Sequence, residues 1–475
     1  KGSYLVISNA TTACGSFTKV GSATGGTIVK MGLSRQEFKG GLNNFGGAFV
    51  VEEGTAVYSI HYAFGDPGSD WSSYPGYLPP TVEVRAGATA EIAHNSAFYI
   101  RAFHVAGTGV GGQGAVVLKS TSGSGLIQKL YLDDDAYVAS EIAGDVVQGR
   151  NKASSGLSAK VNPAILELNG HTLTLGGTST RIGISGCKVT DSVGTGRIVY
   201  EAAANGERVV QFTGTNTVCS VPITFEGDTR VRFYNACAPI DSPITANGSL
   251  TFTYACDSGA GVGLTDAWNV WRGDIAFANA GSVLNLNPSG ANNQLTILGT
   301  ISGDANVTFG ATDASASGVV RLGGHNTYTG TTTLNGTSKI TPWTHETGAS
   351  SLTTPGRGTG AAVVFDLQGF VLGEGASVNS SSCGFTLYSI TPVPYNTYTL
   401  GNGDYFGGSH GGEGGTVNDN FGKPKNRLPA YDSLLAPVLP GAGGGNGGER
   451  ESASETKTPF YPTEGAAGGG GNRYC

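Results

Sequence analysis

Histidine, the side chain most often used for proton transfer and metal binding, occurs seven times without a catalytic or metal-binding spacing. The positions are 61, 94, 104, 171, 325, 345 and 410. None of them forms the HxH or HExxH pattern of metal hydrolases. His171 follows Asn169-Gly170 and His325 follows Gly323-Gly324. Both histidines are therefore expected to be structural turn residues.

The carboxylates are scattered, apart from the triplet Asp133-Asp134-Asp135. A calcium site needs six or more oxygens from several segments. Consecutive carboxylates on a strand point to alternate faces, so at most two of these three could share an ion. We therefore expect a solvated turn and no metal site. Polysaccharide lyases and hydrolases use paired carboxylates or Asp/Arg/Lys clusters on one sheet face. No such group is visible in the sequence, which predicts no catalytic residue and no cofactor.

Seven cysteines are present, and none forms a CxxC pair, which argues against a zinc or thioredoxin-like site. Cys219, Cys237 and Cys256 are spaced by 18 and 19 residues, which would fit one coil of a β-solenoid. Stacked on successive rungs, these cysteines and Cys187 would be either disulfide-bonded or buried free thiols. The odd count leaves at least one thiol unpaired, and Cys475, the last residue, is the candidate for an intermolecular bond or a free thiol.

The composition excludes several classes of partner. Charged residues are 13% of the chain and the formal net charge is −7, with no basic run, so nucleic acid is not an expected partner. No stretch approaches about 18 apolar residues, so no membrane-spanning helix is expected.

The elements that must position these side chains are short β-strands. Apolar and polar residues alternate with period two, and 78 glycines interrupt almost every window that could hold a helical period. Ile223 and Phe225 precede a Gly227-Asp228 turn, and Val231 and Phe233 follow it. No helix is predicted, and residues 133–149 are the least strand-like stretch. The pattern fits either a sandwich or barrel, or a parallel β-helix.

Two pairs of segments resemble a known family. The first pair is residues 303–309 and 319–334, which read GDANVTF and VVRLGGHNTYTGTTTL. These resemble the autotransporter-associated β-strand repeat of bacterial cell-surface proteins. The second pair is residues 130–138 and 166–175, which read LYLDDDAYV and LELNGHTLTL and are similar to the region that often precedes those repeats. The resemblance implies a right-handed parallel β-helix (β-solenoid), export, and a surface or secreted location.

The chain divides by composition into four parts. We expect a β-rich solenoid portion with loop insertions at 1–125, a parallel β-helix with autotransporter-type repeats at 126–345, a terminal β-rich cap at 346–400, and a Gly/Pro/Tyr-rich extension at 401–475. Glycine runs at 407–415, 441–448 and 465–471 leave the extension without a core of its own. Its expected anchors on a neighbouring subunit are Tyr405, Phe406, Tyr431, Phe460, Tyr461 and Tyr474.

A solenoid followed by an extension without its own core predicts a non-enzymatic structural subunit of an extracellular or cell-surface bacterial fibre. The fibre would be assembled head to tail from copies of the chain, through the solenoid ends and the extension. The alternative is a monomeric surface adhesin or passenger domain that binds carbohydrate. A polysaccharide lyase or hydrolase is a third possibility that would rest on fold analogy alone. Trp268 and Trp271 flank a turn. Exposed, they would stack on sugar rings or on another subunit; buried, which is commoner, they would close the solenoid core.

Overall fold

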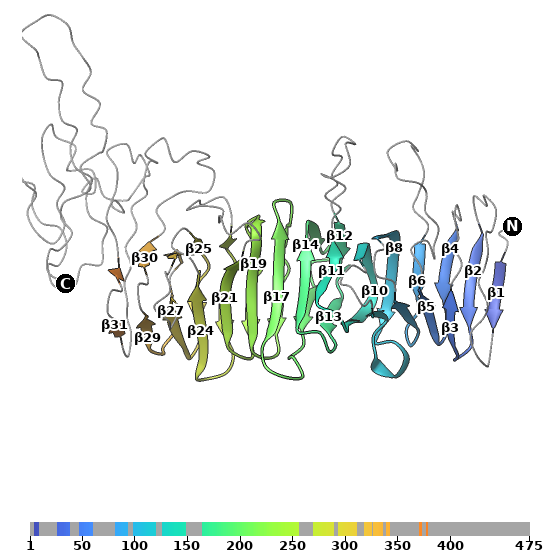
Figure 1. Cartoon of the computed structure of the whole chain (residues 1–475), viewed down its shortest axis with the longest axis horizontal. Helices are drawn as coiled ribbons and strands as arrows, with labels where there is room; N and C mark the ends of the chain where they lie inside the picture. The colour runs from blue at the N-terminus through green and yellow to red at the C-terminus, as the bar shows by residue number, and fades with distance from the viewer. Residues whose placement is uncertain are drawn as a thin grey trace, which may run out of the picture. The chain divides into compact units, whose positions relative to one another are not determined.

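The described part of the chain consists almost entirely of β-strands that pair in parallel (Figure 1). The computed structural model describes residues 4–8, 26–38, 47–59, 81–93, 98–119, 126–148, 164–255, 269–288, 293–310, 318–324, 326–335, 339–342, 370–372 and 377–378. Within these ranges there is one 3-10 turn, η2 (Val110–Gly112), and no α-helix. The all-β prediction is confirmed, and the strand pairing is that of a β-solenoid rather than of a sandwich.

The strands of the first unit (Lys1–Val319, Gly324–Ser338, Leu367–Gly375) form three parallel ladders, here called A, B and C. Ladder A contains β1 (Tyr4–Ser8), β2 (Thr27–Met31), β4 (Ala48–Val51), β6 (Thr81–Val84), β8 (Phe98–Gly107), the first part of β10 (Leu126–Ser140), β12 (Ala164–Glu167) and β15 (Cys187–Thr190). Two single bridges, Lys188 to Val218 and Ile240 to Trp271, and a backbone hydrogen bond from Asp241 to Cys219 continue it to β22 (Val270–Trp271) and β25 (Gln294–Ile297).

Ladder B contains β3 (Arg35–Phe38), β5 (Thr55–Tyr58), β7 (Thr89–Ile92), β9 (Val116–Leu118), the last part of β10, β13 (Thr172–Gly176), β16 (Arg197–Tyr200), β18 (Ile223–Phe225), β20 (Ile244–Ala246), β23 (Ile275–Phe277) and β26 (Ile301–Ser302).

Ladder C contains β11 (Gly144–Gln148), β14 (Arg181–Ser185), β17 (Arg208–Gly214), β19 (Thr229–Cys237), β21 (Leu250–Ala255), β24 (Ser282–Asn287), β27 (Ala305–Phe309), β29 (Thr332–Leu334) and β31 (Phe370–Leu372). In Figure 1 its members β17, β19, β21 and β24 lie side by side.

The second unit (Val320–Gly323, Lys339–Asp366, Ala376–Cys475) contributes few described residues. They belong to β28 (Val319–Leu322), β30 (Lys339–Pro342) and β32 (Ser377–Val378). β30 and β32 pair in parallel.

The core is made of like side chains stacked from coil to coil. In ladder B one such stack is made of five isoleucines in register, each at most 2% exposed: Ile198, Ile223, Ile244, Ile275 and Ile301. In ladder C a second stack contains Val210, Val231, Phe252, Leu286, Phe309 and Leu334, all fully buried. Each such side chain contributes about 1.5–3 kcal/mol by leaving water, so the stacks account for much of the cohesion between coils.

The length of a coil differs from the 18 or 19 residues suggested by the cysteine spacing. Register partners in successive coils are 20 residues apart at the shortest, as in Arg35 and Thr55, and 38 apart in Thr332 and Phe370. Apart from long strands such as β8 and β10, most strands have three to six residues, so much of the difference lies in the connections between them. Such variation is expected, since each coil needs only to present its strands to its neighbours.

Candidate functional site

Three adjacent carboxylates project from a bulge in β10. Between Leu132 and Ala136 the register against β8 shifts, because these residues pair with Val105 and Gly107. Four steps along β10 thus oppose two steps along β8, and the extra residues bend outward. As a result Asp133, Asp134 and Asp135 are all exposed instead of alternating between faces. The expectation of a turn here was wrong: the residues lie within a strand, and the bulge removes the alternation.

Histidines from the two neighbouring coils flank this bulge. His104, on β8, places its Nδ1 3.1 Å from Oδ1 of Asp133. Its ring stacks on Tyr131, the register partner on β10, with centroids 5.0 Å apart. His171, directly before β13, is a turn residue as predicted, because its backbone N–H donates to the carbonyl of Leu168. His325 lies outside the described residues.

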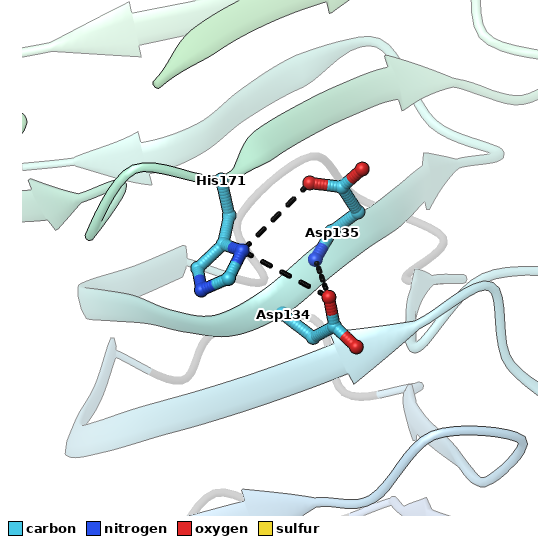
Figure 2. Close-up of side chains that lie close together, drawn as sticks. All are labelled: Asp134, Asp135 and His171. Atoms are coloured by element: carbon cyan, nitrogen blue, oxygen red, sulfur yellow. Dashed lines mark hydrogen bonds and ion pairs between the residues drawn. The ribbon is translucent and has the colours of Figure 1, made fainter. Parts of the chain in front are cut away.

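His171 and two of the carboxylates converge (Figure 2). Nδ1 of His171 lies 3.8 Å from Oδ1 of Asp134 and 3.8 Å from Oδ1 of Asp135. Two backbone groups fix the carboxylates: the N–H of Asp135 donates to Asp134 at 2.8 Å, and the N–H of Thr172 donates to Asp135 at 2.7 Å. Among the described residues this is the one group of three or more His, Cys, Asp or Glu side chains whose ligand atoms all lie within 4.8 Å of one another.

Elsewhere, polar side chains tie one coil to the next. Side-chain oxygens of Asp and Asn residues accept backbone N–H groups from a neighbouring coil. Asp228 accepts from Ser249 at 2.8 Å, Asp274 from Thr300 at 2.7 Å, and Asn306 from Thr331 at 2.8 Å. The two partners are 21, 26 and 25 residues apart, which is one coil. Asp228 and Asp274, two of the acids that sequence analysis treated as scattered, thus share with Asn306 the structural task of joining neighbouring coils.

Arg208 also joins neighbouring coils, but from a buried position. Arg208 is the first residue of β17 and is only 1% exposed. The guanidinium donates to four backbone carbonyls in two successive turns, namely those of Gly177, Ser179, Glu201 and Ala202. Desolvation lowers the pKa of Arg208 from its ordinary value. Sequence analysis missed this residue, because nothing local distinguishes it from an exposed arginine such as Arg230.

The cysteines within the described residues belong to the solenoid core. Cys187, Cys219 and Cys237 are buried and free, which excludes a disulfide among them. Burial raises the pKa of all three thiols, that of Cys219 to about 11. Cys237 pairs with Gly214, so the expected stacking of Cys237 on Cys219 was wrong. The reason is that the coil exceeds the spacing of these cysteines. Cys256 and Cys475 lie outside the described residues.

Of the aromatic residues considered for binding or assembly, Trp271 lies in the described part of the chain and the others lie outside it. Trp271 is fully buried, which confirms the core interpretation for this residue. Trp268 lies outside the described residues, as do the six expected anchors of the extension, Tyr405, Phe406, Tyr431, Phe460, Tyr461 and Tyr474. The fold therefore offers Trp271 neither to a sugar nor to a second subunit.

Asp145 should make stability depend on pH. It pairs with Gly183 across β11 and β14, and its carboxylate lies where a Cβ of residue 183 would sit. Burial raises the pKa of Asp145 to about 6, from 3.8, and Arg181 opposes the shift. A raised folded-state pKa means that the folded chain holds the proton more tightly, so this contribution to stability is present below about pH 4 and is lost as pH rises to about 6.

We expect Asp145→Asn to match the wild type near pH 4 and to exceed it by about 1–3 kcal/mol at pH 8. The measurement is the difference in urea midpoint between variant and wild type at each pH. Taking the difference removes the opposite trend of Glu167 and Asp191, whose pKa values are lowered by hydrogen bonds that outweigh their desolvation. A difference that does not change with pH would contradict the assignment.

No helix among the described residues is long and apolar enough to cross a membrane. Comparisons with protein-family profiles, with curated proteins and with solved structures gave no match for this chain.

Proposed function

We propose that the chain is a non-enzymatic structural subunit of an extracellular or cell-surface bacterial fibre. In this proposal the coils form a right-handed parallel β-helix, the hand that parallel crossover connections take in nearly all sheets. Residues 401–475 form an extension that reaches onto a neighbouring copy and adds contacts to it. Contact between two different ends of identical subunits repeats without closure and builds a filament.

The observation that carries this proposal is how the polar groups are used. Several polar side chains form hydrogen bonds that hold one coil to the next, namely those of Asp228, Asp274, Asn306 and Arg208. Ion pairs act similarly: Lys119 lies 3.7 Å from Glu91 and 3.2 Å from Glu141. Together with the stacked apolar core, these bonds favour a body whose task is to bear load along its ladders. The sequence resemblance to autotransporter-associated repeats supports the location outside the cell.

Electron microscopy of the purified full-length chain tests the proposal. We expect filaments under negative stain, and sedimentation of most of the material at concentrations where filaments are seen. A matched variant replaces the six anchors Tyr405, Phe406, Tyr431, Phe460, Tyr461 and Tyr474 with Ser. It should keep the circular-dichroism spectrum of the wild type and lose the filaments, because the extension would lose the aromatic side chains proposed to anchor it.

Cys475→Ser separates a covalent from a non-covalent link. If Cys475 joins subunits, wild-type filaments should give disulfide-linked dimers on a non-reducing gel, and the variant should not. Wild-type chain that remains monomeric at every concentration would overturn the fibre and favour the monomeric adhesin. Filaments that persist in the six-Ser variant would overturn the role of the extension.

A further inference from the structure

We infer that Asp134, Asp135 and His171 form a binding site for a divalent transition metal of the Zn²⁺ type, which joins β10 to the coil that contains β12 and β13. All three residues lie in the described part of the chain, and the site does not require assembly into a fibre.

The spacing of the three ligand atoms is the first argument. At 3.8 Å, Nδ1 of His171 is too far from either carboxylate for a hydrogen bond. The Nδ1 atom therefore lies beside the Oδ1 atoms of both carboxylates without a hydrogen bond to either. With two sides of 3.8 Å and a third of at most 4.8 Å, the point equidistant from the three atoms lies about 2.1–2.5 Å from each. That is close to the length of a metal–ligand bond.

The donor set is the second argument, and it selects the class of metal. One imidazole nitrogen with two carboxylate oxygens suits Zn²⁺ and related ions. Ca²⁺ and Mg²⁺ prefer six or more oxygen ligands or several retained waters, and they do not favour nitrogen. Three protein ligands leave one tetrahedral position open to solvent, and the 68% and 70% exposure of the Asp134 and Asp135 side chains provides access.

The way the ligands are held is the third argument. The N–H groups of Asp135 and Thr172 orient the two carboxylates before any ion arrives, and such fixed partners raise affinity at metal sites. His171 comes from the next coil, so an ion bound here would connect two coils that β10 and β13 already pair. Asp133 is occupied by His104 at 3.1 Å and lies outside the group of three.

Titration of chelator-treated full-length chain with Zn²⁺ alone, followed by calorimetry, tests the site. We expect one ion per chain with a dissociation constant in the micromolar range and an increase in Tm with Zn²⁺ concentration. Co²⁺ in place of Zn²⁺ should give visible absorption bands typical of four-coordinate nitrogen and oxygen ligation.

Three variants separate coordination from simple charge attraction. His171→Ala and Asp134→Asn should each weaken Zn²⁺ binding tenfold or more. Asp133→Asn, which removes the same charge one residue away, should change the affinity less than threefold. All three positions are exposed or partly exposed, so the metal-free Tm of each variant should match the wild type.

Wild-type chain that binds no Zn²⁺ at 100 µM would overturn the site. Equal losses in Asp133→Asn and Asp134→Asn would also overturn it, because they would show attraction to a diffuse negative surface. The same holds if His171→Ala leaves the affinity unchanged, since the imidazole is what distinguishes this group from an ordinary acidic cluster.

Discussion

Replacing Trp271 with Ala is expected to lower the free energy of unfolding by about 3–5 kcal/mol, the largest effect of any single core change considered. The indole is fully buried at the junction of ladders A and C. Its ring centroid lies 5.6 Å from that of Phe212, 6.4 Å from Phe233 and 5.5 Å from Phe252. These three phenylalanines belong to three successive coils of ladder C, so the cavity would weaken all of them at once.

The measurement is the urea midpoint followed by circular dichroism, because the substitution removes a fluorescent reporter. Trp271→Phe should cost much less, since Nε1 of Trp271 has no hydrogen-bond partner in the described part of the chain and only volume is lost. Leu33→Ala is the matched surface control: at 87% exposure it should change stability by no more than about 0.5 kcal/mol. A loss in Leu33→Ala equal to that in Trp271→Ala would contradict the core assignment.

Replacing Arg208 with Ala is expected to cost about 3–5 kcal/mol as well, for an electrostatic reason. Four backbone carbonyls in the turns after β13 and β16 would lose their donor, with bonds of 2.6 to 3.2 Å in the wild type. Removing one partner from a buried polar network leaves the others unsatisfied, and each such group costs about 1–3 kcal/mol. Arg208→Lys should recover part of the loss, because an ammonium has three donors in place of five.

Arg230→Ala provides the control, since Arg230 lies on the next coil of the same ladder and pairs with Val209. It forms a 2.7 Å ion pair with Glu207, and its side chain is 47% exposed. An exposed pair of this kind contributes at most about 1 kcal/mol. We expect the difference between the two arginine variants to persist in 0.5 M NaCl, which screens the surface pair and leaves the buried donor unaffected. Similar losses in the two variants would show that Arg208 acts only through its charge.

Local pattern was enough to predict the class of fold. Alternation in segments such as Ile223–Phe225 marks strands with one buried face, and the Gly and Asn residues between them mark turns. The structure confirms both, and His171 and Trp271 occupy the turn and core positions expected of them. These properties depend on neighbours within a few residues, which a sequence displays directly.

The outcome at Asp133, Asp134 and Asp135 shows where local pattern fails. Read alone, three consecutive carboxylates suggest a turn, whereas the structure places them in β10. The bulge arises because β10 has two more residues than β8 between the register pairs Leu132–Val105 and Ala136–Gly107. It therefore depends on two segments that lie about 29 residues apart in the sequence. The convergence of Asp134 and Asp135 with His171 depends in addition on the register of β13. Neither the bulge nor the proximity of His171 can be predicted from the three aspartates alone.

The sequence by itself thus determined that the described part of the chain is built of β-strands, that many of them alternate buried and more exposed residues, and that Gly and Asn occur at the turns between them. Only the tertiary structure decided the coil length, the pairing of Cys237 with Gly214, the burial of Arg208 under four carbonyls, and the meeting of His171 with two carboxylates. The physical reason is that strand character follows from local alternation, whereas register follows from which apolar side chains stack across coils 20 to 38 residues apart.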